Sequence, residues 1–448
     1  MLPQVRDRVD PRRLYLAIQV VDGFFVAVGY TTAIVYRVTA GHLNPLQLVL
    51  LGTVLEVSYF LLQLPAGVLA DLVSRRLCVI AGSYLVTAGF LLQGLSARFP
   101  VQLAGQVPVG FGAALGFGAQ EAWLADEAGQ AELTKVFLRA TQLGLIAGLA
   151  GSILSGVLAA QGLQVPFLVA AGLSGLLSLW LTCVMPERGF VRPQRAVRPG
   201  GVVRQSWTAF TAQATTTRRA IRLVPGLVLL LGMMACLGAW SEGFDRLWGA
   251  YLLHDVRLPS PLGLGPAGWF SALAVASALL GLGSTEWARR RTSRLGADSA
   301  VSTLLLLTLG TAGGVLLMIA TRQYVLVVAC YLAVATMRPV FSPLITGWVT
   351  GRVDASVRAT ALSATDLFDS AGQIAGGPVI GAVGLLASIR AALLASAVAL
   401  GPAVALLAAA SRRVHPRQDA AAPDPASPAA GGAGTAGPGP AEPGTAAS

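Results

Sequence analysis

The chain has 448 residues, of which 54% are hydrophobic and only 12% are charged. A soluble protein of this length would need roughly twice that charged share to cover its surface, so the composition excludes a soluble globular protein. The net charge of +11 comes from basic residues in alternate loops, which is typical of cytoplasmic loops rather than of a nucleic-acid-binding surface. Between the charges lie apolar runs of about 20 residues, each long enough to cross a bilayer as a helix. The sequence therefore predicts an all-α polytopic membrane protein.

The N-terminal half, residues 14–185, contains six of these apolar runs. Residues 1–13 are polar and are expected to form a cytoplasmic N-terminus. The first run is too long for a signal-peptide core and is predicted to be a retained span. The six predicted spans lie near 14–36, from after Asn44 to about 70, and near 77–95, 101–123, 140–160 and 165–185.

A basic segment, residues 186–223, separates this half from the next one. It contains eight arginines and is predicted to be a cytoplasmic linker, with an amphipathic stretch around Trp207 at the lipid surface. The C-terminal half, residues 224–411, has predicted spans near 225–252, 267–287, 300–320, 324–347, 359–382 and 388–411. Residues 412–448 are rich in Ala, Pro and Gly and are expected to be a disordered cytoplasmic tail.

The pattern thus predicts twelve transmembrane helices in two pseudo-symmetric six-helix halves. With the N-terminus inside, the basic clusters all fall in the cytoplasm, and the opposite face receives only scattered arginines: Arg37, Arg98, Arg257, Arg322 and Arg390. The fifth and eleventh spans open on similar sequences, Arg139-Ala140-Thr141 and Arg358-Ala359-Thr360. Such a match at equivalent positions favours an internal duplication with a binding site between the halves.

A polar segment, Gly67–Arg76, turns the chain between the second and third predicted spans, because its charges cannot lie in hydrocarbon. This segment resembles the Gly-x-Leu-Ala-Asp-x-x-Gly-Arg-Arg/Lys signature of the major facilitator superfamily. It matches at Gly67, Leu69, Ala70, Asp71, Arg75 and Arg76, and it has Ser74 where the family usually has glycine. The resemblance covers residues 14–411 and implies a secondary transporter that alternates access by rocking its two halves.

The resemblance also implies a conformational latch on the cytoplasmic side. Asp71 would face the start of the eleventh span near Arg358, and an acid beside a helix N-terminus and a cation is favourable. The pseudo-symmetric contact would join Glu286 to the start of the fifth span near Arg139. The alternative is that these residues are ordinary solvated loop charges.

A second family pattern, in the fourth span of many proton-driven members, is only partly present. Gly110, Gly112, Ala113 and Ala114 match it, but Gln106 takes the place of its arginine. The fifth span also lacks the Gly-Pro of the drug-antiporter signature. These departures weaken a specific assignment as an antiporter.

Ionisable residues inside predicted spans are costly and therefore mark candidate functional sites. Glu242 and Arg246 are four residues apart and can pair on one helix face, which also allows a purely structural, self-neutralised pair. Asp366 and Asp369 are three apart, so they disfavour each other's ionisation and suit proton exchange, with Arg338 as a partner. The full set proposed for proton or substrate handling is Asp22, Glu56, Glu242, Asp245, Arg246, Arg338, Asp366 and Asp369.

The sequence therefore predicts a proton-coupled exporter of small amphipathic or drug-like molecules. A proton-coupled uptake permease for a small metabolite is the first alternative, and a non-transporting receptor or membrane enzyme is a distant one. We recognise no catalytic, metal-binding or cofactor-binding motif in the sequence. The expected setting is a monomer in the bilayer of a bacterial plasma membrane.

Overall fold

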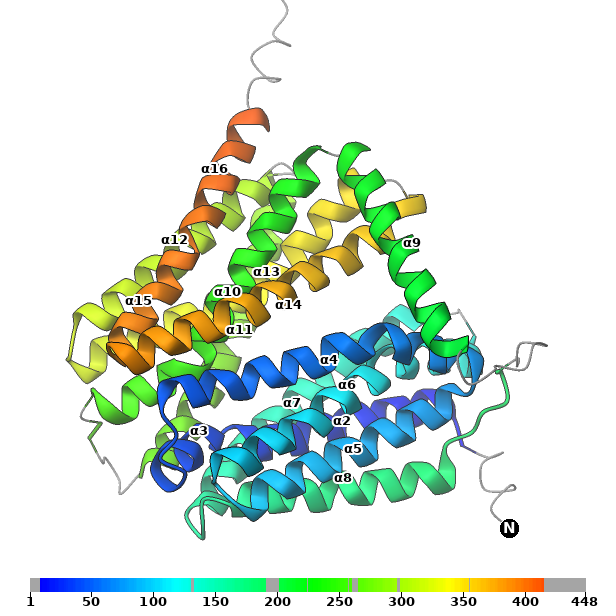
Figure 1. Cartoon of the computed structure of the whole chain (residues 1–448), viewed down its shortest axis with the longest axis horizontal. Helices are drawn as coiled ribbons and strands as arrows, with labels where there is room; N and C mark the ends of the chain where they lie inside the picture. Colours follow the sequence, from blue (N-terminus) through cyan, green and yellow to red (C-terminus); the bar gives the residue numbers. More distant parts are fainter. Residues whose placement is uncertain are drawn as a thin grey trace, which may run out of the picture.

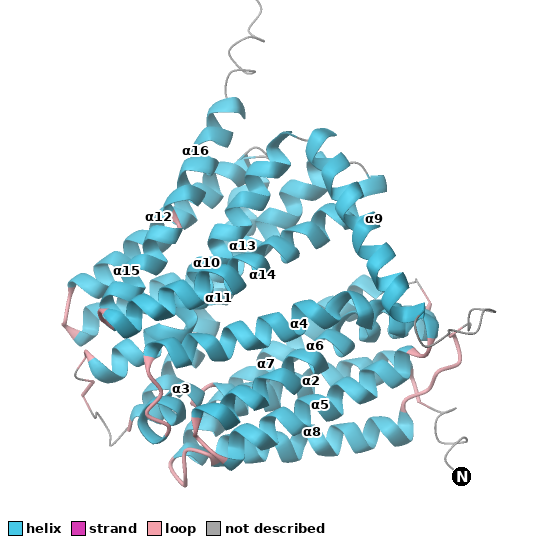
Figure 2. Cartoon of the chain, in the orientation of Figure 1, coloured by secondary structure: helices cyan, strands magenta, loops and turns pink. Residues whose placement is uncertain are grey.

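The computed structural model describes residues 9–129, 133–190, 201–223, 225–256, 258–259, 265–295, 299–353 and 355–414. Within these residues every regular element is a helix (Figure 2). The first part of the chain forms α2 (Pro11–Tyr30), α3 (Ala33–Val35), the π-helical η1 (Tyr36–Ala40), α4 (Pro45–Leu72), α5 (Arg75–Leu95), α6 (Phe99–Ala128), α7 (Leu133–Ala159) and α8 (Val165–Val184). The remainder forms α9 (Gly201–Leu223), α10 (Pro225–His254), α11 (Pro266–Leu295), α12 (Ser299–Ala320), α13 (Tyr324–Arg352), α14 (Ala355–Leu386), α15 (Ile389–Ala399) and α16 (Gly401–Val414).

Each predicted span coincides with one helix or with a run of consecutive helices. Ten helical segments of the described chain are long and apolar enough to cross a membrane, and these exclude α6 and α14. Both of those helices are long, with 30 and 32 residues, and they lie where the fourth and eleventh spans are predicted. Polar residues interrupt their apolar runs, namely Gln102 and Gln106 in α6 and Asp366 and Asp369 in α14. The all-helical membrane fold is confirmed, and the count of twelve spans stays a prediction.

Local sequence signals explain several helix starts. Asn44 caps α4 in a reciprocal arrangement with Gln47, with bonds of 2.9 and 3.0 Å, and Pro45 occupies the first helical position. Ser74 caps α5 by accepting the backbone N–H of Leu77 at 2.9 Å. Because α4 ends at Leu72 and α5 begins at Arg75, the capped turn between them is short.

The helices pack into two groups with separate hydrophobic cores: α2–α8 form the first group and α10–α16 form the second. The first core contains Ile18, Phe90, Trp123 and Phe167, from α2, α5, α6 and α8. The second core is built mainly from α10–α16, but it also takes in Leu48 and Leu51 of α4. Helix α4 therefore packs against both groups.

The two groups touch at one end of the molecule, which we call the far end: the end at which α4 begins and α14 ends. A Cβ added to Gly377 of α14 would lie 2.9 Å from both Thr53 of α4 and Glu242 of α10, and one added to Gly384 would lie 2.7 Å from Pro45. At the opposite end, here the linker end, α9 lies against both α4 and α14 (Figure 1). The predicted linker therefore contains a helix that bridges the two groups.

Parts of the predicted termini and linker fall outside the described residues. These parts are residues 1–8, 191–200 and 415–448, which include Arg192, Arg195 and Arg198. In α9, Trp207 is 67% exposed, as expected for the amphipathic stretch, and its predicted contact with lipid stays a prediction.

Candidate functional site

Seven of the eight charged residues predicted for proton or substrate handling line one cavity of about 680 Å³. We call it the acidic cavity; its charged residues are Glu56, Glu242, Asp245, Arg246, Arg338, Asp366 and Asp369. Helices α10, α13 and α14 supply six of these side chains, and α4 supplies Glu56 across the boundary between the groups. The rest of its polar lining consists of the hydroxyl groups of Ser241, Ser342, Thr346 and Thr365 and the amide of Gln373.

Two ion pairs organise one wall of the acidic cavity. Arg246 Nε lies 3.2 Å from Glu242 Oε1 along α10, which is the pair that the four-residue spacing predicts. Glu242 is only 2% exposed, so its charge depends on this partner. Arg338 of α13 forms an ion pair with Asp245 of α10 and lies 5.2 Å from the ring centre of Trp240. The sequence suggested Asp366 or Asp369 as the partner of Arg338; the structure pairs it with Asp245 of α10 instead.

The other three acids of the acidic cavity have only neutral hydrogen-bond partners or none among the described side chains. Gln373 Nε2 donates to Asp369 Oδ2 at 2.8 Å, and Ser370 Oγ lies 3.5 Å from Glu56 Oε2. Asp366 lines the same cavity. Carboxyl groups without a cationic partner inside a membrane protein are costly, which is why they mark proton or cation paths.

Asp22 is the exception, because it lines a different cavity. This second cavity, the Asp22 cavity, has a volume of about 270 Å³ and lies among α2, α5, α6 and α8. Its lining is mostly apolar and includes Phe25, Phe90 and Phe117. Beside Asp22, Gln19 Nε2 donates to Gln120 Oε1 at 3.0 Å. The structure therefore separates Asp22 from the other predicted acids.

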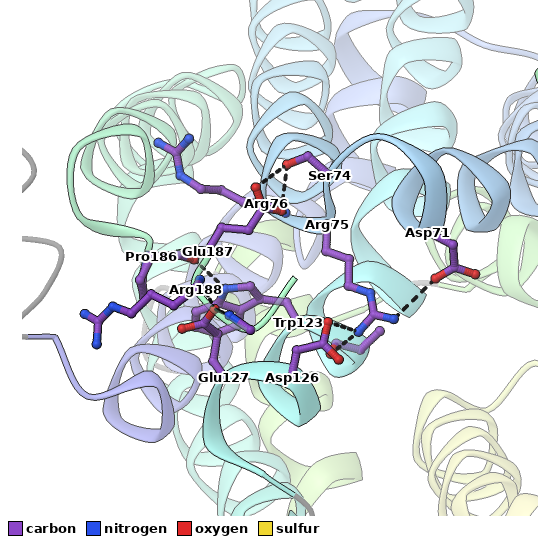
Figure 3. Close-up of polar contacts among 12 residues, drawn as sticks. Asp71, Ser74, Arg75, Arg76, Trp123, Asp126, Glu127, Pro186, Glu187 and Arg188 are labelled. Carbon is purple, nitrogen blue, oxygen red and sulfur yellow. Dashed lines mark hydrogen bonds and ion pairs between the residues drawn. The ribbon is translucent and has the colours of Figure 1, made fainter. Parts of the chain in front are cut away.

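The predicted turn Gly67–Arg76 lies at the linker end, where Arg75 contacts α6 (Figure 3) and Arg76 contacts the end of α8. Arg75 forms an ion pair with Asp126 of α6 and donates to the carbonyl of Ala122 at 2.7 Å. Arg76 donates to the carbonyls of Met185 and Thr182, both at 2.8 Å. These bonds fix the turn to the ends of α6 and α8.

Asp71 has a more open position. Its side chain is 67% exposed and lies 3.4 Å from Arg75 Nη2. Beside it, a Cβ added to Gly67 would meet nothing within 4 Å. Arg358, the predicted latch partner, donates from its Nη2 to the carbonyl of Val353 at 3.5 Å. Among the described residues, no hydrogen bond or ion pair joins Asp71 to Arg358, so the latch remains a prediction.

The pseudo-symmetric latch is likewise not formed between described side chains. Glu286 accepts bonds from Arg289 at 2.7 Å and from Arg290 at 2.6 Å, both on its own helix. Arg139 is exposed on α7. Glu286 therefore has local partners in this state.

Sequence reasoning missed Glu187, which ties the turn to the segment after α8. Its two carboxylate oxygens accept the Ser74 hydroxyl at 2.7 and 2.8 Å, and Oε1 also accepts the backbone N–H of Arg76 at 3.1 Å. Next to it, Trp123 Nε1 donates to the carbonyl of Pro186 at 2.7 Å. The one available signal is an acid directly after the proline that ends the sixth span.

Sequence reasoning also missed Arg37, which it treated as a scattered outer arginine. Arg37 is 5% exposed and lies in η1. Its Nε donates to Gln102 Oε1 at 3.1 Å and its Nη2 to Gln93 Oε1 at 2.7 Å. It lines a third cavity of about 290 Å³, the far cavity, together with Tyr30, Gln106, Asp245, Arg246 and Trp248.

Comparisons with known proteins bear on this arrangement. A sequence profile of the Major Facilitator Superfamily matches residues 16–368. A relative from Bacillus subtilis (strain 168), the uncharacterized MFS-type transporter YxaM, is 25% identical over 137 residues. That match spans 31% of this chain and 34% of the relative, so it covers about a third of the relative's length.

Solved structures of transporters share the fold at low sequence identity. The nucleoside transporter NupG superimposes with a TM-score of 0.68 at 15% identity, covering 91% of this chain and 100% of its own. The peptide transporter POT in complex with sulfate gives a TM-score of 0.69 at 15% identity, covering 93% and 98%. A bacterial homologue of the human lysosomal transporter Spinster gives 0.65 at 17% identity, covering 90% and 98%.

Proposed function

This chain belongs to the major facilitator superfamily of transporters, and on that premise we propose that it is a proton-coupled secondary transporter that exports small amphipathic molecules. The observation that carries the proposal is the acidic cavity. Five carboxyl groups and two guanidinium groups share it, and among the described side chains ion pairs engage only Glu242 and Asp245 of these acids. The remaining acids, Glu56, Asp366 and Asp369, are the groups that bind and release protons.

The proposed architecture has twelve spans in two six-helix halves, with α6 and α14 as the fourth and eleventh spans. The two separate hydrophobic cores support this division. The arginine distribution supports a cytoplasmic linker end with both termini inside a bacterial plasma membrane. In this orientation the far end, where α4 meets α14, faces the outside.

Alternating access then follows from the contacts between the two groups. In the described state the groups meet at the far end, through close approaches such as Gly384 to Pro45. The proposed latches, Asp71 with Arg358 and Glu286 with Arg139, are not formed among the described side chains. We assign the described state to a conformation that is closed at the far end and open at the linker end. The latches are absent from this conformation and would form when the linker end closes.

The Asp22 cavity supports an amphipathic substrate. Aromatic rings and one carboxyl group line it together, and such a lining suits a molecule with an apolar body and a polar group. The second candidate function is uptake of a small metabolite. It is favoured by the hydroxyl groups that line the acidic cavity, from Ser241, Ser342, Thr346 and Thr365.

Transport by the purified full-length protein in sealed vesicles tests the proposal. A panel of radiolabelled amphipathic compounds and small metabolites is offered with an imposed proton gradient, then again after a protonophore collapses it. We expect accumulation that stops when the gradient is lost. Accumulation that is insensitive to the protonophore would contradict proton coupling, and the class of compound accumulated separates export of amphipathic molecules from metabolite uptake.

A further inference from the structure

The far cavity contains a buried cation with no acidic partner. Arg37 is 5% exposed, and within the described chain no carboxylate lies at ion-pair distance from it. Gln102 accepts from its Nε and Gln93 from its Nη2, and the rings of Tyr30 and Phe167 lie 5.9 and 5.8 Å from the guanidinium carbon, but none of these groups supplies a counter-charge. A guanidinium carries five N–H donors, so this arrangement leaves further donors of Arg37 available to the cavity that it lines. A buried charge without a counter-charge is unfavourable unless an anion binds beside it.

Two unpartnered polar atoms belong to side chains that line the same cavity. The hydroxyl of Tyr30 and the Oε1 of Gln106 are both buried, and neither has a hydrogen-bond partner in the described structure. Gln106 is itself only 1% exposed. Buried polar groups in folded proteins are almost always satisfied, so two unpartnered atoms on side chains of one cavity are explained if a ligand that enters between these side chains supplies their partners. The Tyr30 hydroxyl can donate to an anion, while Gln106 Oε1 needs a donor.

Arg246 supplies a second guanidinium from the other group of helices. It lines both the far cavity and the acidic cavity, and so does Asp245. Their own partners, Glu242 and Arg338, neutralise them, so the unbalanced charge of the far cavity is that of Arg37. A Cβ added to Gly52 of α4 would collide with Glu242 and Arg246, so this glycine allows the pair to pack against α4.

From this geometry we propose that the far cavity binds a carboxylate group, held by Arg37, Arg246 and the Tyr30 hydroxyl. An N–H or O–H of the same ligand donates to Gln106 Oε1. The ligand class is therefore a small organic acid with a hydrogen-bond donor near its carboxylate. The cavity, at about 290 Å³, admits a molecule of this size. This inference deepens the proposed transport function by naming a chemical group of the substrate.

Binding to the purified full-length protein tests the proposal without a proton gradient or transport, so its failure is distinguishable from failure of proton coupling. The probes are lactate, hippurate and benzoate, each compared with its neutral methyl ester, by calorimetry and by thermal unfolding. We expect lactate or hippurate to bind and stabilise the protein while the esters do not. If none of the three carboxylates binds, or if the esters bind as well as the acids, the proposal is overturned.

Variants separate the roles of the three side chains. Arg37→Gln should weaken carboxylate binding by about tenfold or more, because it removes a charged hydrogen-bond donor. Arg37→Lys should retain part of the affinity, since it keeps the charge. Gln106→Leu should weaken lactate and hippurate but not benzoate, which has no donor. The control is Arg98→Gln, an exposed arginine at the same end of the molecule.

Tyr30→Phe provides a test that does not depend on how well the Arg37 variants fold. Removing an unsatisfied buried hydroxyl should leave the empty protein as stable as the wild type or more stable. The same change should weaken carboxylate binding severalfold. Wild-type affinity in both Tyr30→Phe and Arg37→Gln, or in Tyr30→Phe alone if Arg37→Gln does not fold, would overturn the proposal.

Discussion

The hydroxyl of Ser74 donates to both carboxylate oxygens of Glu187, at 2.7 and 2.8 Å, while its oxygen accepts the N–H of Leu77 at 2.9 Å. The family signature usually has glycine at this position. Here the serine caps α5 and also joins it to the segment after α8 (Figure 3). Asp71 belongs to this fixed turn and remains exposed, so its carboxylate can contact another part of the molecule without a rearrangement of the turn.

Replacing Ser74 by alanine should destabilise the protein. The change removes a helix cap and the bonds to Glu187 from a side chain that is 1% exposed, which we expect to cost about 1–2 kcal/mol. Thermal unfolding of the purified protein measures the loss. Thr350→Ala is the control, because the Thr350 hydroxyl bonds only carbonyls of its own helix. Equal unfolding temperatures for the two variants would show that the Ser74–Glu187 contact contributes nothing.

The ion pair between Asp245 and Arg338 should be energetically coupled. Each side chain is 35% exposed, so we expect Asp245→Asn or Arg338→Gln alone to cost about 1–3 kcal/mol, less than for a fully buried pair. The double variant should cost less than the sum, because neither charge is then left unpaired. The exposed pair Asp10–Arg13 serves as the control cycle, where we expect coupling near zero. Additive losses at Asp245 and Arg338 would mean that their contact carries no net energy.

Asp369→Asn should separate coupling from binding. The amide can still bond Gln373 but cannot carry a proton, so accumulation driven by the proton gradient should fall to background. Exchange of labelled for unlabelled substrate across the vesicle membrane needs no net proton movement and should persist. Asp255→Asn is the control, since Asp255 pairs with Arg390 outside the acidic cavity. Full gradient-driven accumulation in Asp369→Asn would remove Asp369 from the proton path.

Asp71→Asn should slow transport without affecting stability. The Asp71 side chain is 67% exposed, so its loss should change the free energy of unfolding by less than about 0.5 kcal/mol. If Asp71 latches the linker end near Arg358, the initial rate of transport should fall severalfold. Initial rates and unfolding temperatures of the same preparation distinguish the two effects. Unchanged turnover would leave Asp71 as an ordinary solvated charge.

The sequence predicts the helices well because membrane spans are recognisable by their high hydropathy. The positions of all the predicted spans coincide with helices, although the apolar runs of two helices are interrupted, by Gln102 and Gln106 in α6 and by Asp366 and Asp369 in α14. The Glu242–Arg246 pair is likewise predictable, since both residues belong to one helix and are four positions apart.

Contacts between helices could not be predicted in the same way. A helix that is apolar on nearly all sides gives no clear indication of which face meets which neighbour. Sequence alone therefore did not pair Arg338 with Asp245, separate Asp22 from the other acids, or bring Arg37 between Gln93 and Gln102. These relationships depend on helix rotation and on close approaches at residues such as Gly377.

The central claim, that proton binding drives alternating access, is tested most directly by distances between spin labels at the two ends of the molecule. In a variant without the four native cysteines, one label pair is placed at Val73 and Gly351 near the linker end. A second pair is placed at Leu95 and Leu386 near the far end. All four sites are exposed. Distances are measured by pulsed electron spin resonance at acidic and alkaline pH, with Asp369→Asn as the variant that cannot respond at that site.

If proton binding drives alternating access, the two distances should change in opposite directions with pH: one shortens while the other lengthens, and Asp369→Asn weakens the response. Distances that are independent of pH, or that change in the same direction at both ends, would contradict it.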